Sequence, residues 1–359
     1  MKKICFIDYD MSVRGGVEQV TASLVNALAK HYEVHLVSIV ENGQTAYDFK
    51  TEIKYSVLLE KEERLSRMRK RLKPLLKRYF YENDIDVAII QGNYPGFLAS
   101  SVRFSTKTKL VFCDHGALMN QWDRKDIVVI RLIASLLCHK VITLTEQSRN
   151  DYIKRFLLPK KKVGCIYNWI DLDIPRSETY DAKSKRIVSA GRFGKEKGFD
   201  MLIKVFAPVA EKYPDWHLDI FGDGEMMETV KELIDEYAVF DNVHLMGMCK
   251  DLAQRYKDYA MYVLPSYREG MPLVLLEAKA NRLPIVGFDI MTGPREIVRD
   301  GVDGILVQPY DLEKMEEAIC RLIENEDKRS QMSEKSQENL DKFSKENILK
   351  QWIELVESL

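Results

Sequence analysis

The sequence has no long apolar run, no paired cysteine motif and almost no net charge. Its longest apolar segment, Ile127–Cys138, spans 12 residues and contains Arg131, so it is too short and too polar to cross a bilayer. The opening letters M-K-K-I-C-F-I-D hold too short an apolar run for a signal peptide. We therefore expect a cytoplasmic protein.

The six cysteines are scattered, with no C-x-x-C pair and no histidine close enough to complete a zinc pattern. Reduced, buried cysteine is the expectation for such a chain. A net charge of −1 supplies no bulk field that would attract nucleic acid. What is present is an ordinary globular composition, 46% apolar and 30% charged, and 359 residues are enough for two domains.

The first half alternates strand and helix patterns, which predicts a parallel sheet covered on both faces. A buried strand leads into the glycine loop R-G-G-V-E, with Gly15 and Gly16 just before a helix over 17–30. Because this is not G-x-G-x-x-G, it supports a bound dinucleotide only weakly, and tight strand–helix packing explains the glycines equally well. The expected strands are Ile4–Ile7, Val34–Val40, Ile53–Leu58, Val87–Ile90, Leu110–Cys113, Val141–Leu144 and Val163–Tyr167.

His115 follows one of these strands, at the edge where open α/β sheets bind ligands. Further on, residues 171–173 read D-L-D, which resembles a metal site. One short D-x-D in a turn is weak evidence, and turn chemistry explains it better.

Residues 61–80 carry nine Lys/Arg against two Glu, with apolar residues at helical spacing. This predicts a basic amphipathic helix, kinked at Pro74. Two interpretations stand side by side: a helix packed on the domain with a solvated cationic face, or a contact with an anionic membrane.

Polar residues 175–184 are predicted to link the halves, giving domains 1–174 and 175–344. The second half repeats the α/β alternation, and the closing helix, 345–359, carries an apolar stripe that must pack on something. Its expected strands are Arg186–Ala190, His217–Phe221, Val243–Met246, Met261–Leu264, Ile285–Gly287 and Ile305–Val307.

Two stretches of the second half suit a ligand that is part phosphate and part sugar. G-R-F-G-K-E-K-G (191–198) places Arg192 and Lys197 at a strand-to-helix turn, where cations and amides hold a diphosphate. In S-Y-R-E-G-M-P-L-V-L-L-E-A-K-A-N (266–281), Glu269 lies in a loop, Pro272 is expected as the first helical residue and Glu277 lies inside the helix. Each acid alone is more simply an ordinary surface glutamate.

Together these motifs resemble the retaining glycosyltransferases of family 4, which have the GT-B fold of two Rossmann-like domains facing across a cleft. The resemblance is carried by G-R-F-G-K-E-K-G-F-D, I-F-G-D-G (220–224), V-H-L-M-G (243–247), the 266–278 stretch, L-P-I-V-G-F-D (283–289) and G-P-R-E-I-V-R-D-G-V-D-G-I-L-V (293–307). The first half matches more loosely, through G-G-V-E, H-G (115–116) and N-W-I-D (168–171), where Trp169 replaces the family's usual glycine.

The resemblance implies roles for individual residues. Arg192 and Lys197 would clamp the diphosphate, Glu277 would hold the ribose, and Glu269 would position the transferred sugar. His115 would reach that sugar from the first domain, and the last helix would cross back to that domain. Gly15 and Gly16 would line the acceptor side. The other donor-binding positions are Gly222, Met246, Gly247, Met248, Gly270, Met271, Pro272 and Leu273.

The function expected from this resemblance is transfer of a hexose or N-acetylhexosamine from a nucleotide diphosphate sugar, with UDP as the nucleotide, to a growing glycan. No metal or other cofactor is expected. The basic helix suggests a lipid-linked acceptor in capsule, O-antigen or exopolysaccharide synthesis, and peripheral contact with the cytoplasmic membrane face. The alternatives are an epimerase or phosphorylase of the same architecture, or a non-catalytic nucleotide-sugar binder; an NAD enzyme is disfavoured.

Overall fold

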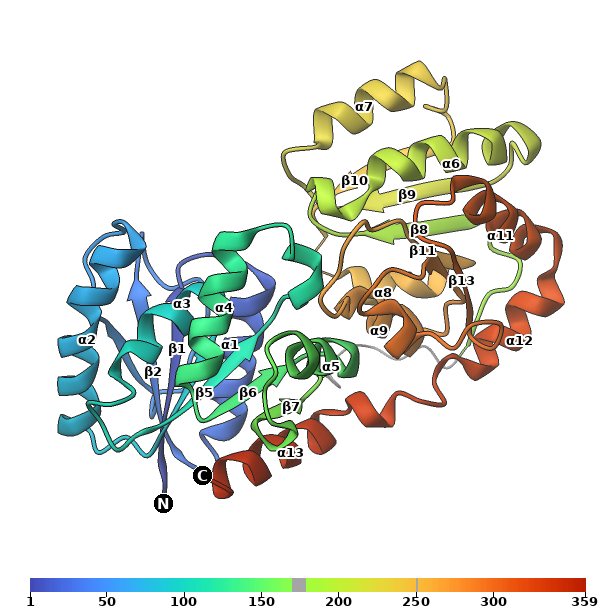
Figure 1. The fold of residues 1–359 in the computed structure, drawn as a ribbon. Coiled ribbons are helices and arrows are strands. Elements are labelled where there is room, and N and C mark those ends of the chain that lie inside the picture. Colours follow the sequence, from blue (N-terminus) through green and yellow to red (C-terminus); the bar gives the residue numbers. More distant parts are fainter. Residues whose placement is uncertain (170–178, 250) are drawn as a thin grey trace. The chain divides into compact units, whose positions relative to one another are not determined.

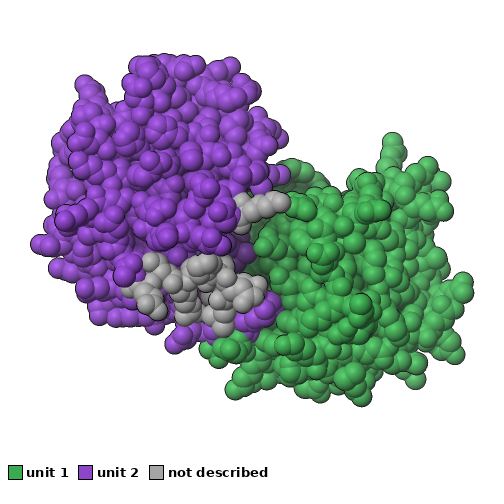
Figure 2. All heavy atoms as spheres, turned by 180° about the vertical axis from the view of Figure 1, so that it is seen from behind, with its two compact units in different colours: residues 1–168, 346–359 green, residues 169–345 purple. Residues whose placement is uncertain are grey.

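The computed structural model describes residues 1–169, 179–249 and 251–359 (Figure 1). The chain divides into two compact units, coloured separately in Figure 2: residues 1–168 with 346–359, and residues 169–345. The predicted boundary after residue 174 and the D-L-D triplet at 171–173 lie outside the described residues, as do residues 175–178 of the predicted linker.

The first unit is a seven-stranded parallel sheet in the order β3-β2-β1-β4-β5-β6-β7. Its strands are β1 (Lys3–Asp10), β2 (Glu33–Val40), β3 (Lys54–Val57), β4 (Val87–Gln91), β5 (Lys109–Asp114), β6 (Lys140–Thr143) and β7 (Val163–Cys165). Its helices are α1 (Gly16–Leu28), α2 (Leu65–Glu82), α3 (Asn93–Ala99), α4 (Lys125–Leu137), α5 (Glu146–Arg155) and α13 (Lys345–Glu357). The predicted parallel α/β architecture is confirmed.

The second unit is a six-stranded parallel sheet in the order β10-β9-β8-β11-β12-β13. Its strands are β8 (Arg186–Ala190), β9 (His217–Phe221), β10 (Val243–Gly247), β11 (Met261–Leu264), β12 (Ile285–Phe288) and β13 (Gly304–Val307). Its helices are α6 (Phe199–Lys212), α7 (Met227–Glu236), α8 (Leu252–Arg255), α9 (Leu273–Ala280), α10 (Pro294–Ile297), α11 (Leu312–Glu324) and α12 (Glu326–Ser336).

Helix α2 shows how the first core is made. Its apolar stripe, Met68, Leu72, Leu76 and Phe80, is buried in one cluster with side chains from α3, α4 and the sheet. The stripe therefore packs α2 against the sheet domain. Arg69 is half-buried over the Phe97 ring, and the other cationic side chains of α2 are left on the outer face. The packed-helix interpretation is correct for the apolar face.

The last helix, α13, lies at the end of the chain and packs against the first unit. Ile348, Trp352 and Val356 are buried, which accounts for the apolar stripe in the sequence. The ammonium of Lys2 donates to the carbonyl of Val356 at 2.8 Å, so the two ends of the chain meet in one unit.

Among the described residues, no helix combines the length and the apolar character that spanning a membrane requires.

Candidate functional site

Parallel strands bring the predicted donor-binding residues of the second unit to one edge of its sheet. The loops that follow β8, β9, β10, β11 and β12 all leave from the carboxyl ends of neighbouring strands. Ligands of open α/β sheets bind at this edge.

The 191–198 loop is held by its own packing. Phe193 is fully buried and contacts Phe199 at the start of α6, with ring centroids 4.6 Å apart. Gly198 has φ +67°, and a Cβ there would lie 2.2 Å from the carbonyl oxygen of Pro265. Only glycine fits that backbone and that approach, so the loop is fixed against the strand end that carries the 266–281 stretch.

Lys197 and Glu269, from these two loops, form an ion pair in which Lys197 Nζ lies 2.8 Å from Glu269 Oε1. The buried Ser266 hydroxyl donates to the same oxygen at 2.7 Å, and the Thr292 hydroxyl donates to the Glu269 carbonyl at 2.6 Å. Glu269 is only 8% exposed, so its carboxylate is held at a fixed position rather than solvated in a loop. The alternative of a solvated loop acid is wrong for this residue.

Arg192 occupies a different environment from Lys197. Its side chain is 74% exposed and pairs with Glu196 of the same loop at 2.9 Å. Binding of a diphosphate by both cations therefore requires Arg192 to exchange Glu196 for phosphate, whereas Lys197 already lies beside the sugar-positioning candidate.

Helix α9 begins at Leu273, and Pro272 is its N-cap residue with ψ 100°. The prediction that Pro272 is the first helical residue is wrong by one position, because its ψ is extended. The opening amides of the helix, beginning with Leu273 and Val274, lack partners four residues back and form an anion-binding end. Gly270 and Met271 connect this helix end to Glu269.

Glu277 lies one turn further along α9, partly buried. Burial raises the pKa of its carboxyl above the usual range, and interaction with the Tyr256 hydroxyl lowers it in part. Tyr256 is itself fully buried. Sequence reasoning missed Tyr256, since a tyrosine in a short turn 21 residues before Glu277 carries no recognisable signal.

The ends of β9 and β10 meet through glycine backbone. The Gly222 amide donates to the Gly247 carbonyl at 2.9 Å, and Gly222 has φ +137° with no room for a Cβ beside the Gly191 carbonyl. Met246 and Met248 flank this junction and are exposed. These apolar side chains at a strand end are available to a flat ring such as a nucleotide base.

In the first unit, Gly15 and Gly16 lie between the carboxyl end of β1 and the start of α1. The Tyr47 hydroxyl bonds both the amide and the carbonyl of Gly15, at 3.2 and 3.1 Å. A Cβ on Gly15 would meet the Glu18 carboxylate, whereas one on Gly16 would meet nothing within 4 Å. Because the Glu18 carboxylate is the flexible end of a side chain on α1 itself, tight strand–helix packing requires neither glycine.

His115 follows β5 and lies beside Gln91 at the end of β4, with 2.6 Å between Nε2 and the Gln91 Oε1. Burial lowers the pKa of His115 to about 4, so the ring is neutral at ordinary pH. Beneath it, Asp114 bonds the fully buried Arg131 at 3.0 Å and the Tyr152 hydroxyl at 2.7 Å. This buried group fixes the strand end that presents His115.

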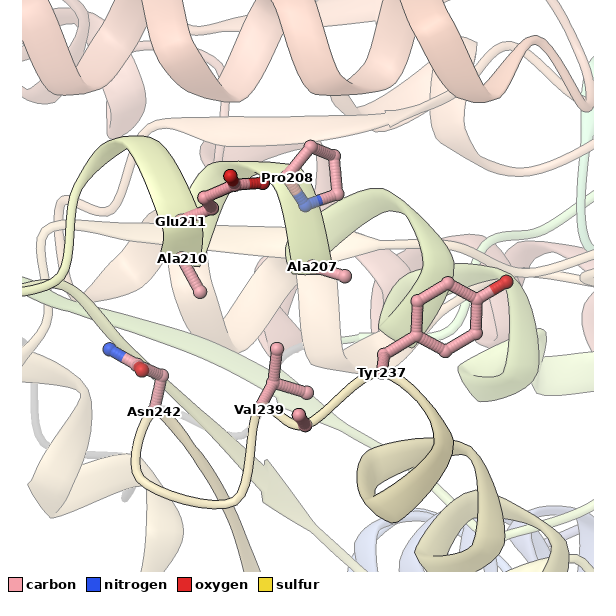
Figure 3. A pocket seen from close by; sticks show the side chains of 8 residues that line it. Ala207, Pro208, Ala210, Glu211, Tyr237, Val239 and Asn242 are labelled. Atoms are coloured by element: carbon pink, nitrogen blue, oxygen red, sulfur yellow. The ribbon is translucent and has the colours of Figure 1, made fainter.

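One surface hollow lies elsewhere in the second unit, between α6 and residues 237–242, and has a volume of about 500 Å³ (Figure 3). Small apolar side chains line it together with Glu211, Tyr237 and Asn242. The Asn242 amide already donates to the carbonyls of Pro214 and Trp216. Glu211 and Tyr237 are the other polar residues of the lining. Within the part of the chain that is described, no three His, Cys, Asp or Glu side chains gather as metal ligands would.

When the chain is compared with known proteins, each of its halves matches a protein family. Residues 14–174 match the family described as Glycosyltransferase Family 4, and residues 172–339 match Glycosyl transferases group 1. An uncharacterized glycosyltransferase of Haemophilus influenzae is 30% identical, over 98% of this chain and 99% of its own length.

Two further relatives have named activities. The amylovoran biosynthesis glycosyltransferase AmsD of Erwinia amylovora is 27% identical over 99% of this chain and its full length. The N-acetylgalactosamine-N,N'-diacetylbacillosaminyl-diphospho-undecaprenol 4-alpha-N-acetylgalactosaminyltransferase of Campylobacter jejuni is 28% identical over 97% of both chains.

Solved structures agree in fold. Sucrose-phosphate synthase from Thermosynechococcus elongatus superposes with a TM-score of 0.85 at 18% identity, over 100% of this chain and 99% of that one. Anabaena HepE in complex with UDP gives 0.84 at 19%, over all of both chains. The predicted GT-B fold is confirmed.

Proposed function

This chain belongs to the glycosyltransferases of group 1 and family 4, and we propose that it transfers a hexose or N-acetylhexosamine from a UDP-sugar to a growing glycan. The observation that carries the proposal is the 2.8 Å pair between Lys197 and Glu269, beside the opening amides of α9. A cation and free amides suit a phosphate, and a fixed carboxylate suits the hydroxyls of a sugar.

The chemistry follows from where charge develops. When the bond between the sugar and the phosphate breaks, negative charge builds on the departing diphosphate. The Lys197 ammonium, the α9 amides and Arg192, once released from Glu196, would stabilise it, and preorganised groups of this kind carry the largest catalytic contribution. Such a site stabilises the transition state, in which the nucleotide diphosphate departs, more than it stabilises the bound, intact donor.

Glu269 acts in this scheme as a positioning group for the sugar. Its carboxylate is already bonded to Lys197 and Ser266, so it is poorly placed to take a proton from an acceptor hydroxyl. Attack on the same face as the leaving phosphate, with retention of configuration, then needs no protein nucleophile. Glu277 would hold the ribose, and the neutral His115 would contact the transferred sugar.

The nucleotide and the acceptor are proposed from what the similar proteins bind and act on. UDP is favoured because HepE, of the same fold, holds UDP. A lipid-linked glycan is favoured because the Campylobacter relative acts on a diphospho-undecaprenol glycan and AmsD serves amylovoran synthesis. We also propose that the cationic outer face of α2 contacts an anionic membrane.

Catalysis is proposed to need no metal, since cations and helix amides supply the countercharge to the diphosphate. Activity unaffected by EDTA is the expected result. A strict requirement for Mn²⁺ would contradict this part of the proposal.

The experiment that tests the main proposal is a thermal-shift and hydrolysis screen across UDP-, GDP- and ADP-sugars. We expect stabilisation and slow hydrolysis with one or more UDP-sugars. Lys197→Ala should abolish hydrolysis, while Lys195→Ala, an exposed lysine of the same loop, should not. A response to GDP- or ADP-sugars alone would overturn the choice of nucleotide, and no response to any donor would overturn the function.

A further inference from the structure

The first unit carries a second cationic surface that the basic helix does not include. Three segments, 99–113, 132–145 and 156–169, contain no acidic residue. We call their cations the cationic edge: Arg103, Lys107, Lys109, Lys140, Lys160, Lys161 and Lys162.

The order of the strands in the sheet brings these cations close together. Strands β5, β6 and β7 are parallel neighbours, and the seven cations lie at or just before their starting ends. The Lys140 ammonium donates to the Lys161 carbonyl at 2.7 Å, and that of Lys162 donates to the Leu136 carbonyl at 2.9 Å. The Leu110 amide at the start of β5 donates to His139 Nδ1 at 2.9 Å, so the loops before all three strands form one continuous surface.

The described residues supply no counterion to the cationic edge. None of its seven cations forms an ion pair with any residue in the described ranges. His139 lies among them, and burial first, then Arg103, Lys109 and Lys162, lowers its pKa to about 4. Like charges are therefore held close together here.

Large apolar side chains stand exposed among these cations. Phe104 and Leu157 are 85% and 86% exposed, and Leu136 is 57% exposed. Phe104 follows Arg103 directly, Leu136 accepts the bond from Lys162, and Leu157 precedes the lysine run. Exposed apolar residues are ordinary when they are scattered, but a set interleaved with unpaired cations is typical of surfaces that meet lipid.

The cationic edge continues to the carboxyl end of α2. A groove of about 760 Å³ lies between them, lined by Lys77 and Tyr81 from α2 and by Thr106 and Lys107 from the loop before β5. Tyr81 is 84% exposed. Two acids at this border, Asp84 and Asp86, also line the groove. Asp84 pairs with the Lys3 ammonium at 3.7 Å, and Asp86 accepts a hydrogen bond from the Lys3 backbone amide at 2.8 Å.

We propose that the cationic edge is a docking surface for an anionic phospholipid bilayer. Its cations pair with lipid phosphates, while Phe104, Leu136 and Leu157 enter the boundary between headgroups and acyl chains. A soluble polyanion satisfies the charges but leaves these three side chains in water, so the apolar set favours lipid.

The geometry has a consequence for the reaction, which rests on the proposed function. The cationic edge and His115 lie at opposite ends of β5, a strand of six residues. At roughly 3.3 Å per residue, docking holds the His115 end about 20 Å farther from the lipid. That arrangement suits an acceptor whose growing end stands away from the bilayer.

Vesicle co-sedimentation of the full chain tests the docking surface without any donor or acceptor. We expect binding to vesicles of equal parts phosphatidylglycerol and phosphatidylcholine, and none to phosphatidylcholine alone. Replacing Lys107, Lys160 and Lys161 with Ser should lower the partition coefficient roughly 100-fold. The matched control replaces Lys204, Lys257 and Lys314, exposed lysines of the second unit, and should bind as the unchanged protein does.

A second variant separates lipid from a soluble polyanion. Phe104→Ser keeps every charge and should weaken vesicle binding about tenfold. Polyphosphate binding equal in Phe104→Ser and the unchanged protein, with no preference for anionic vesicles, would overturn the proposal in favour of a polyanion. Unchanged vesicle binding by the triple variant would also overturn it. Because the readout is lipid binding, failure here leaves the proposed transfer activity standing.

Discussion

The amide oxygen of Gln91 lies 2.6 Å from Nε2 of His115, across the carboxyl ends of two neighbouring strands. An amide oxygen only accepts hydrogen bonds, so Nε2 carries the proton and Nδ1 keeps its lone pair. With the pKa lowered by burial to about 4, His115 is a neutral ring with a fixed tautomer. Gln91 is therefore a positioning residue for His115.

Gln91→Glu is expected to change the pH profile of transfer. The unchanged protein should show no loss of kcat/KM from His115 between about pH 5 and 8, because the ring stays neutral above its lowered pKa. A carboxylate in place of the amide raises that pKa, so the variant should lose activity as the pH falls through the same range. Gln91→Met, which adds no charge, is the control and should show no loss of activity as the pH falls through this range. A flat profile for Gln91→Glu would refute the positioning role.

Lys197→Ala should reduce kcat for sugar transfer by about 10²–10³-fold, the usual effect of removing one preorganised group from developing charge. The fold should survive, because Ser266 still bonds the Glu269 carboxylate. Thermal melting and steady-state kinetics check both points, with Lys195→Ala as the control from the same loop. Activity of Lys197→Ala close to that of the unchanged protein would contradict the assigned role.

Glu277→Ala should also strongly reduce transfer, through weaker donor binding. The carboxyl is partly buried beside Tyr256. When it is removed, water replaces its hydrogen bonds to the ribose only in part. Titration with UDP should show the loss directly, and the free energy of unfolding should change little. UDP affinity unchanged in this variant would remove Glu277 from the ribose site.

The sequence predicted where the loops of the candidate site lie, but it did not predict which contacts their side chains make. The strand and helix patterns predicted that Lys197 and Glu269 lie in loops that follow strands. The resemblance implied that both residues bind the same donor. Nothing in the spacing of Arg192 showed that it faces Glu196 and solvent instead. Likewise, Arg131 was visible as one charge in an apolar run, but its partner Asp114 lies on a different element.

The cationic edge was beyond sequence reasoning for a related reason. Arg103 and Lys162 are separated by about sixty residues, and only the order of the strands brings their loops together. The basic helix was visible because its cations are contiguous. Its apolar stripe did not distinguish a protein core from a bilayer, since both require the same helical spacing.

Replacing Arg67, Arg69, Lys70 and Arg71 with Ser is the test of the α2 contact. Arg67 and Arg71 pair with Glu63 at 3.0 and 2.6 Å, and Arg69 lies over the Phe97 ring at 4.3 Å. Their charges are already partly engaged, so we expect a modest fall in sedimentation with anionic vesicles, smaller than that from the cationic-edge triple variant. The buried stripe is untouched, but the half-buried Arg69 loses its contact with Phe97, so we expect a small fall in thermal stability. Binding equal to the unchanged protein would leave α2 a packed helix whose cationic face serves only solvation.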